Sequence, residues 1–384
     1  MISPQFRPLV GGYERAAERL SSAVAATGVR VVVVAERRDR AWAKAERSSG
    51  YEVLRLWCVY RPHVHALTSL LSCGAYLLWR GRRFDVWHVH QYGAHAALAV
   101  AVGRVLRRPV VLKLTSSGSA GGIAKVVGAS GHVRALACWH RRVAACVATS
   151  EETAREAVSF GIPAERVYLI PNGVDGSEFR PATSIERVAA RRLLGVACAR
   201  MVLYVGRLSP EKNPLGLLDA WARIPESSRL GALLVYLGDG SEVSHVRDRI
   251  KALGLTSSVR LAGLHGDVSR WYQAADFLTL SSLREGLSNS MIEAMASGLP
   301  VISTRVSGAS VLEQEPASGI VVDIADTVQY ARAIDRLLWE DALRVRLGEN
   351  ARRRFEATFS LKLVADRTIQ MYDSVLSSAN GRAR

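Results

Sequence analysis

Short β-branched runs alternate with helix-length segments along most of this chain, and this alternation constrains the fold more than any other feature. Strands that alternate with helices form parallel βαβ units. The first series of runs lies at residues 29–35, 52–57, 85–90, 109–114, 145–150 and 167–171. The pattern then restarts at residues 201–206, 232–238, 259–263, 276–282 and 300–304. We therefore predict an α/β protein with two doubly wound parallel sheets.

A turn-rich connector, PNGVDGSEFRPAT at residues 171–183, separates the two series. Its Asn-Gly, Asp-Gly and Pro residues favour turns. We predict an N-terminal domain at 1–175, a C-terminal domain at 176–360, and a last helix at 361–384 that packs back toward the N-terminal domain. Ligands of open parallel sheets bind beyond the carboxyl ends of the strands, so we expect the site in a cleft between the two domains.

The first strand departs from this pattern. The glycine loop PLVGGYERAAERL would normally follow a strand, and only MISP stands before it. We expect either a very short first strand or a recorded start that lies downstream of the true one.

Positive charge is concentrated in the first half of the chain. The net charge is +16, and residues 1–150 hold 22 Lys and Arg against 7 Asp and Glu. Such a field attracts anionic lipid headgroups, so we expect either an anionic membrane surface as a partner or an ordinary solvated basic surface. We expect no nucleic acid, because the basic residues are not interleaved with aromatic ones.

The sequence also indicates the compartment. The five cysteines are widely spaced and include no CxxC pair, which predicts neither a disulfide framework nor a zinc site. No signal peptide is recognisable, and the nearest candidate for a membrane span, the sixteen uncharged residues 64–79, is shorter than a span. We interpret that run as a core helix, with a helix that also enters a lipid surface as the alternative. A cytoplasmic location is expected, either free or peripheral on the inner face of the cytoplasmic membrane.

Functional-looking groups follow the strands of the second series. Arg207 and Lys212 lie in GRLSPEKNP, just before a helix-length segment. Two cations near a helix start, where free N–H groups already favour an anion, suit a diphosphate. The alternative is a pair of solvated loop charges. Gly238 begins the loop GDGS, where backbone can approach a ligand closely or simply form a turn.

Two glutamates bracket the loop LREGLSN and the helix that follows it. On one helix, Glu285 and Glu293 would be about 12 Å apart along the axis, too far for a glycosidase-type acid/base pair. With Glu285 in the loop and Glu293 in the helix, they can face two ends of one elongated ligand. The alternatives are a capping box from Ser290 to Glu293 and a surface carboxylate at Glu285.

Metal and nucleotide-hydrolysis motifs are missing from the sequence. His63 and His65, like His88 and His90, form HxH pairs without a completing ligand set, so we interpret them as core or cleft-edge residues. No DxD is present to hold a metal-bound diphosphate, and no GxxxxGK[ST] is present.

Taken together, these segments resemble the retaining glycosyltransferases of family 4, which have the GT-B fold of two facing Rossmann-like domains. The resemblance rests on VGGYERAAERLSSAVAATG, FDVWHVHQYGA, the segment 147–181, LYVGRLSPEKNPLGLLDAW, LGDGSE, the segment 274–304 and GIVVD. These pieces cover most of residues 10–323 in the order of that family.

The resemblance implies a site for a nucleotide-diphosphate sugar. Glu285 and Glu293 match the E-x7-E pair, in which the first residue contacts the donor sugar and the second the ribose. Arg207 and Lys212 match the cations that hold the diphosphate. Further donor contacts are implied for the N–H groups of Gly286, Leu287 and Ser288 and for Gly238, Gly11 and Gly12.

The same resemblance implies the course of the reaction. The acceptor, a glycan, a lipid-linked sugar or a small molecule, attacks from the face that the diphosphate leaves, so configuration is retained without a protein nucleophile. No cofactor or metal is expected, because fixed positive charge stabilises the leaving group.

On the acceptor side the sequence departs from the family. Thr115 stands where many members carry a histidine at the end of a strand. We expect Thr115, Ser116, Gly118 and His90 to line the acceptor side.

Two other functions stay open. A nucleotide-sugar epimerase shares this architecture, and a non-catalytic glycosyltransferase-like subunit would bind a membrane or a partner.

Overall fold

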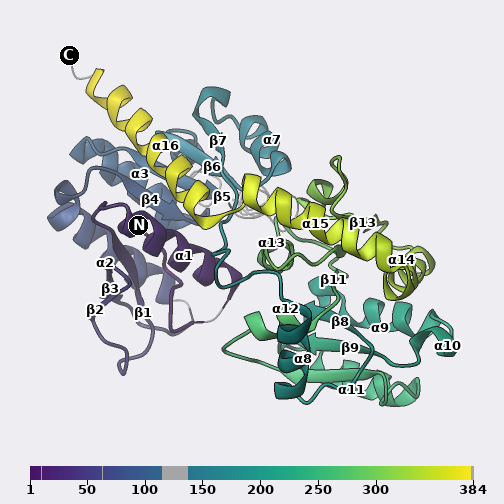
Figure 1. The fold of residues 1–384 in the computed structure, drawn as a ribbon. Coiled ribbons are helices and arrows are strands. Elements are labelled where there is room, and N and C mark those ends of the chain that lie inside the picture. The colour runs from purple at the N-terminus through teal and green to yellow at the C-terminus, as the bar shows by residue number, and fades with distance from the viewer. Residues whose placement is uncertain (10, 63, 115–136, 382–384) are drawn as a thin grey trace. The chain divides into compact units, whose positions relative to one another are not determined.

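The computed structural model describes residues 1–9, 11–62, 64–114 and 137–381. The chain divides into two α/β units (Figure 1). Unit 1 comprises Met1–Gly173 and Leu361–Arg384, and unit 2 comprises Val174–Ser360. The first division lies two residues before the predicted boundary after residue 175, and the second coincides with the start of the predicted last helix.

Unit 1 alternates strands and helices as the sequence pattern predicts. Its strands are β1 (Val32–Arg37), β2 (Ala45–Ser48), β3 (Tyr51–Trp57), β4 (Trp87–His90), β5 (Val110–Leu114), β6 (Ala145–Ala148) and β7 (Val167–Leu169). Its helices are α1 (Gly12–Ala26), α2 (His65–Arg80), α3 (Ala94–Leu106), α6 (Ala137–His140), α7 (Glu151–Ser159) and α16 (Leu361–Gly381), with short 3₁₀ turns at Gly81–Arg83 and Ala164–Arg166.

The strands of unit 1 form two groups, parallel except for β2, that Ile2 joins. The strand orders are β1-β3-β2 and β4-β5-β6-β7, and Ile2 bridges Val34 of β1 and Val89 of β4 in parallel. The first strand is therefore very short in the described chain. The antiparallel strand β2 was not predicted, because its sequence AERS alternates exposed and half-buried residues and has no apolar run.

Helices cover both faces of the unit 1 strands. On one face α1 and α16 pack on each other and on Val33 and Val111. On the other face α2 and α3 pack together, with Leu77 and Val100 in the core. The predicted last helix, now α16, thus belongs to the core of unit 1. No helix among the described residues has the length and apolar character to cross a bilayer.

Unit 2 repeats the alternation. Its strands are β8 (Arg200–Val205), β9 (Ala232–Leu237), β10 (Val259–Gly263), β11 (Phe277–Leu280), β12 (Val301–Thr304) and β13 (Gly319–Val322). Its helices are α8 (Ser184–Leu193), α9 (Pro214–Arg223), α10 (Glu226–Arg229), α11 (Val243–Ala252), α12 (Ser269–Ala274), α13 (Asn289–Ala296), α14 (Thr327–Trp339) and α15 (Asp341–Thr358). Short 3₁₀ turns lie at η4 (Pro210–Lys212) and η5 (Ala309–Leu312).

The parallel sheet of unit 2 is buried on both faces, which explains its continuous apolar strands. Along β8, Met201 and Leu203 belong to the core that α12, α13 and α15 cover. Val202 and Tyr204 belong to the opposite core, under α9, α11 and α14. The strand order is β10-β9-β8-β11-β12-β13.

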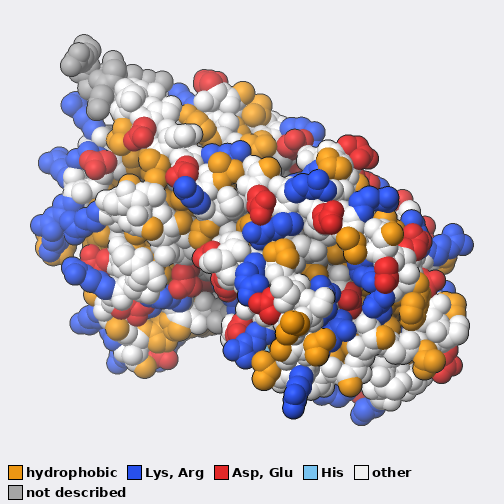
Figure 2. Space-filling view, in the orientation of Figure 1, with side chains coloured by type: hydrophobic (Ala, Val, Ile, Leu, Met, Phe, Trp, Pro, Cys, Tyr) orange, Lys and Arg blue, Asp and Glu red, His pale blue; other side chains and the backbone are white. Residues whose placement is uncertain are grey.

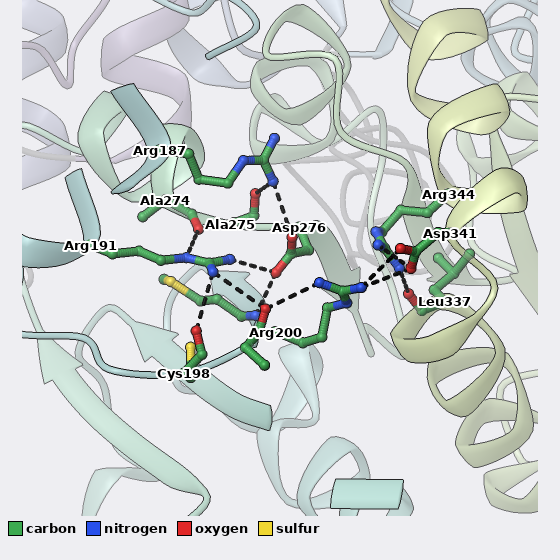
Figure 3. A network of polar contacts seen from close by, with 12 residues as sticks. Arg187, Arg191, Cys198, Arg200, Ala274, Ala275, Asp276, Leu337, Asp341 and Arg344 are labelled. Atoms are coloured by element: carbon green, nitrogen blue, oxygen red, sulfur yellow. Dashed lines mark hydrogen bonds and ion pairs between the residues drawn. The ribbon is translucent and has the colours of Figure 1, made fainter. Parts of the chain in front are cut away.

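A buried carboxylate holds the amino ends of β8 and β11 together (Figure 3). Asp276, just before β11, is 6% exposed and accepts a 2.6 Å hydrogen bond from the N–H of Met201 in β8. Arg187 and Arg191 of α8 donate to its two oxygens at 3.1 and 2.6 Å. This network lies at the strand ends opposite to those that carry Lys212 and Glu285, so we assign it to stability.

We expect Asp276→Asn to lower the free energy of unfolding by about 3 kcal/mol, because two partly buried guanidinium groups lose their counter-charge. Asp341→Asn is the matched control, since Asp341 pairs with Arg200 and Arg344 but its side chain is 64% exposed. Its loss should cost less than about 1 kcal/mol. Urea unfolding measures both values, and equal effects of the two substitutions would contradict the assignment.

Candidate functional site

The strand order of unit 2 reverses between β8 and β11. From β8 the chain proceeds through β9 to β10 toward one edge, and from β11 it proceeds through β12 to β13 toward the other. The order therefore reverses at the β8–β11 pair. In open parallel sheets, ligands bind outside the carboxyl ends of the strands at such a reversal.

Lys212 and Glu285 meet at this point. Lys212 ends η4, in the loop after β8, and Glu285 lies in the loop after β11. The Nζ of Lys212 donates a hydrogen bond to Oε1 of Glu285, and their side chains are 24% and 13% exposed. Ser282 Oγ donates to the other carboxylate oxygen at 2.8 Å. The structure thus brings together two residues that the sequence predicted for one site.

Backbone contacts fix the two loops to each other. Ser281 Oγ donates to the carbonyl oxygens of Lys212 and Asn213, both at 2.9 Å. The N–H of Leu283 donates to the carbonyl oxygen of Glu211 at 2.8 Å. Asn213 then caps α9 by accepting from the N–H of Gly216 at 3.1 Å. The ammonium of Lys212 is therefore held in place before any ligand arrives.

Arg207 is the more exposed of the two predicted cations. Its side chain is 68% exposed, and its guanidinium lies 3.9 Å from the carboxylate of Glu211. A solvated pair of this kind contributes little to stability. Unlike Lys212, Arg207 is thus available to contact an incoming anion with little loss of existing interactions.

The loop before α13 presents backbone donors. Within the described part of the chain, the N–H groups of Gly286, Leu287 and Ser288 have no hydrogen-bond acceptor. Gly308 packs against this loop, and a Cβ there would lie 2.9 Å from the Cα of Leu287, in a backbone conformation with φ of +81°. Free N–H groups at the start of a helix favour an anion.

Glu293 lies deeper than Glu285. It is 3% exposed in α13, and its Oε2 accepts a 2.9 Å hydrogen bond from the hydroxyl of Tyr272 in α12. The alternative of a capping box from Ser290 is wrong, because α13 begins at Asn289 with Ser288 as the N-cap. Ser290 is already inside the helix, so Glu293 does not cap it.

Gly238 has a structural explanation. A Cβ on Gly238 would overlap the carbonyl oxygen of Gly206, and one on Gly240 would overlap that of Leu208. Both glycines have left-handed φ values, +150° and +157°. The loop after β9 therefore packs directly on the loop after β8, which helps to fix the backbone next to Arg207.

Only some of the site residues predicted in unit 1 lie within the described part of the chain. Gly11 is the N-cap of α1, Gly12 is its first residue, and the Glu14 carboxylate packs next to Gly11. His90 ends β4, while the predicted Thr115, Ser116 and Gly118 lie outside the described residues.

The second HxH pair lies on one strand face, as its spacing predicts. His88 and His90 stack with ring centroids 4.7 Å apart, and His88 Nδ1 lies 2.6 Å from the hydroxyl of Tyr372 in α16. Burial is the main cause that lowers the pKa of His90 well below its usual value, and the neighbouring His88 and Lys113 lower it further. Burial also lowers the pKa of Lys113 to about 8. His90 is therefore a neutral, buried side chain near neutral pH.

Sequence reasoning missed the residues that support the two glutamates. Ser282 lies in the loop that follows β11, three residues before Glu285, so its place in that loop could have indicated a site residue. Tyr272 is twenty-one positions before Glu293 in an unremarkable helix, and no local pattern connects them.

Two family descriptions match the chain. Residues 10–178 match "Glycosyltransferase Family 4", and residues 198–354 match "Glycosyl transferases group 1". A similar relative is the lipopolysaccharide core biosynthesis glycosyltransferase LpsE of Rhizobium meliloti, 32% identical over 198 residues, which are 52% of this chain and 57% of LpsE. The matched stretch thus spans little more than half of that relative. The uncharacterized glycosyltransferase MJ1607 of Methanocaldococcus jannaschii is 26% identical over 97% of both chains.

Solved structures agree on the fold. Anabaena Alr3699/HepE, crystallised with UDP and glucose, superposes with a TM-score of 0.79 at 20% identity, over 97% of this chain and 98% of that one. Two α/β units with parallel sheets, the second with its strand order reversed at β8 and β11, are the architecture of the GT-B class of glycosyltransferases. The chain belongs to glycosyltransferase family 4 within that class.

Proposed function

We propose that this chain transfers a sugar from a nucleotide-diphosphate sugar to a glycan, a lipid-linked sugar or a small molecule, with retention of configuration. The observation that carries the proposal is the contact between Lys212 and Glu285 at the strand reversal of unit 2. This contact holds a cation and an anion at the strand reversal, where ligands of open parallel sheets bind. Membership of the family agrees with this chemistry.

The leaving diphosphate determines the main catalytic requirement. Cleavage of the sugar–phosphate bond leaves negative charge on the diphosphate, and preorganised donors aimed at developing charge are usually the largest catalytic contribution. In our proposal, Lys212 and Arg207 supply the positive charge. The N–H groups of Gly286, Leu287 and Ser288 add hydrogen bonds to the phosphate oxygens.

The two carboxylates act at different ends of the donor. Glu285 accepts hydrogen bonds from the sugar hydroxyls while it keeps Lys212 in place, and Glu293 binds the ribose hydroxyls. The different partners support this division, because Glu293 is 3% exposed and tied to Tyr272 whereas the side chain of Glu285 is 13% exposed and tied to Lys212. No residue is assigned as a covalent nucleophile. The acceptor attacks from the face that the diphosphate leaves.

A screen of donors tests the proposal. UDP-, GDP- and ADP-sugars are added to the full chain, and the donor should raise the melting temperature because it binds the folded state. Incubation of the binding donor with candidate acceptors should yield a product whose anomeric configuration, read by NMR, equals that of the donor. An inverted product would refute retention. Conversion of the donor to its C2 epimer without sugar transfer would show instead that the chain is an epimerase.

We expect the transfer rate of desalted enzyme to stay unchanged when Mg²⁺ or Mn²⁺ is added. The reason is that Lys212 and Arg207 replace the metal at the diphosphate and that the sequence has no DxD to hold one. Initial rates with and without each ion measure this. A rate that rises steeply with either ion would contradict the assignment of the leaving-group charge to these two residues.

We further propose that unit 1 docks on an anionic membrane through the outer face of α2. This face carries exposed apolar side chains: Leu67, Leu71, Leu78 and Trp79 are 60%, 62%, 57% and 75% exposed. No Asp or Glu occurs between residues 60 and 84, while Arg61, Arg80, Arg82 and Arg83 lie there. Lys and Arg side chains gather along the edge of unit 1 in Figure 2. Apolar residues with a cationic border suit an anionic lipid interface.

Liposome sedimentation tests this docking. The wild-type chain should bind vesicles with anionic lipid at low salt, and Leu71→Gln with Trp79→Gln should weaken binding at least about tenfold by removing buried apolar area. Higher salt should also weaken it. Leu230→Gln is the control, since Leu230 is 78% exposed on unit 2. Failure of the wild-type chain to sediment with anionic vesicles would exclude the docking.

A further inference from the structure

Three potential metal ligands, Cys58, His65 and His95, lie around Glu36 in unit 1, outside the residues assigned to the donor. Glu36 lies near the end of β1 and is 6% exposed, and Cys58, 8% exposed, directly follows β3. His65 is the first residue of α2, and His95 is in the first turn of α3. The carboxyl ends of parallel strands and the starts of the following helices meet at one edge, which explains the convergence.

The distances suit a single ion. One ligand atom each of Glu36, Cys58 and His65 lies within 4.8 Å of the others. His65 Nε2 is 3.1 Å from Oε2 of Glu36, and His95 Nε2 is 4.0 Å from Oε1. In a tetrahedral zinc site, ligand atoms lie about 3.3–3.8 Å apart, as bond lengths of about 2.0–2.3 Å require. Small inward movements would bring Glu36, Cys58 and His65 to these distances, and a larger movement of His95, which lies outside this group of three, would supply the fourth ligand.

We propose that Glu36, Cys58, His65 and His95 bind a zinc-type divalent ion. A thiolate and two imidazoles select such ions over Mg²⁺ and Ca²⁺, which prefer oxygen ligands. The site is distinct from the diphosphate site of unit 2, so it does not depend on the proposed transfer. Sequence spacing gave no zinc motif, because each of the four ligands comes from a different element.

Surrounding groups act on the same carboxylate. Ser69 Oγ donates to Oε1 of Glu36 at 2.6 Å and lies 2.9 Å from His95 Nε2. Arg38 Nε donates to Oε2 of Glu36 at 2.8 Å. Ser69 orients the carboxylate, as partners of metal ligands commonly do. Arg38 competes with the ion, because its guanidinium already neutralises Glu36.

The ion would join three parts of unit 1 that are far apart in sequence. Cys58 belongs to the segment between β3 and α2, and the N–H of Val59 already donates to Thr68 Oγ1 of α2 at 3.0 Å. An ion bound by Cys58, His65 and Glu36 would fix this segment and the first turn of α2 to the end of β1. The proposed ion has a structural role: it fixes the start of α2, the helix with the exposed apolar face.

Cobalt binding tests the proposal on the full chain after removal of metals. Co²⁺ should bind at one ion per chain and produce an intense thiolate charge-transfer band in the near ultraviolet. Cys58→Ser should abolish the band, and Cys138→Ser, at an exposed cysteine of unit 1, should preserve it. Zn²⁺ should displace Co²⁺. Absence of the band in the wild-type chain, or its persistence in Cys58→Ser, would overturn the proposal.

Two further variants separate metal binding from a general structural role. By calorimetry, His65→Gln should weaken Zn²⁺ binding at least about 100-fold, beyond the usual effect of an outer partner. Arg38→Gln should tighten it, because the competing cation is gone. Loss of affinity in Arg38→Gln would show that the cluster is an ion pair that needs Arg38, and would refute the site. Melting curves without metal establish that each variant is folded.

Discussion

Lys212→Ala should lower kcat about 100- to 1,000-fold, the range found when one preorganised donor to a developing anion is removed. Lys212 is the cation that the structure holds at the strand reversal of unit 2, through Glu285 and through the contacts of Ser281 with its backbone. Its removal also leaves Glu285, 13% exposed, without its counter-charge. That carboxylate would then repel the donor diphosphate. Steady-state kinetics with the identified donor measure the loss.

A double variant distinguishes the two causes of this loss. If repulsion by Glu285 contributes, adding Glu285→Gln to Lys212→Ala should recover part of the donor affinity. Lys251→Ala, at an exposed lysine of α11, is the control and should leave kcat unchanged. A kcat of Lys212→Ala within about threefold of the wild-type value would remove Lys212 from the catalytic site, since less than about 0.7 kcal/mol of transition-state stabilisation would be lost.

Glu293→Ala and Glu285→Ala should affect different kinetic constants. We expect Glu293→Ala to raise the donor Kd about 10- to 100-fold, because hydrogen bonds to a charged group contribute about 1.5–3 kcal/mol. Glu285→Ala should mainly lower kcat, because it positions both the sugar and Lys212. Calorimetry gives the donor Kd, and initial rates at saturating donor give kcat. Unchanged values for both variants would remove the assignment of this pair.

Tyr272→Phe is the control for Glu293. It removes the hydroxyl that donates to Oε2 of Glu293 at 2.9 Å and leaves the carboxylate present. If Glu293 serves only the packing of α12 against α13, Tyr272→Phe and Glu293→Ala should lower the melting temperature alike and leave donor affinity intact. If Glu293 binds the donor, only Glu293→Ala should cost the full loss of affinity.

The sequence predicted most strands because they are buried on both faces and read as continuous apolar runs. It missed β13, although its residues GIVV are apolar, and β2, whose residues AERS carry no such signal because their partner is β3 and one side faces solvent. It also placed the start of α13 too late. Ser290 followed by Glu293 fits a capping box locally, but the chain enters the helix at Asn289. Local patterns fail where the deciding contacts come from elsewhere in the chain.

The sequence also did not predict which apolar side chains of α2 would be exposed. The run from Val64 to Trp79 was interpreted as a core helix, and it is a helix of unit 1 with Cys73 and Leu77 buried. However, Leu71 and Trp79 are exposed on its other side. Hydrophobicity alone does not tell which apolar side chains find a partner. That depends on how many helices cover the face, which is a property of the folded unit.

The sequence by itself determined the two series of strands and helices and the residue types in the loops that follow each strand. The tertiary structure decided which loops meet. Lys212 and Glu285 are 73 positions apart, and they touch only because β8 pairs with β11 rather than with another strand. Periodicity records which residues of a strand are buried, whereas the order of strands depends on packing between distant segments that no local pattern contains.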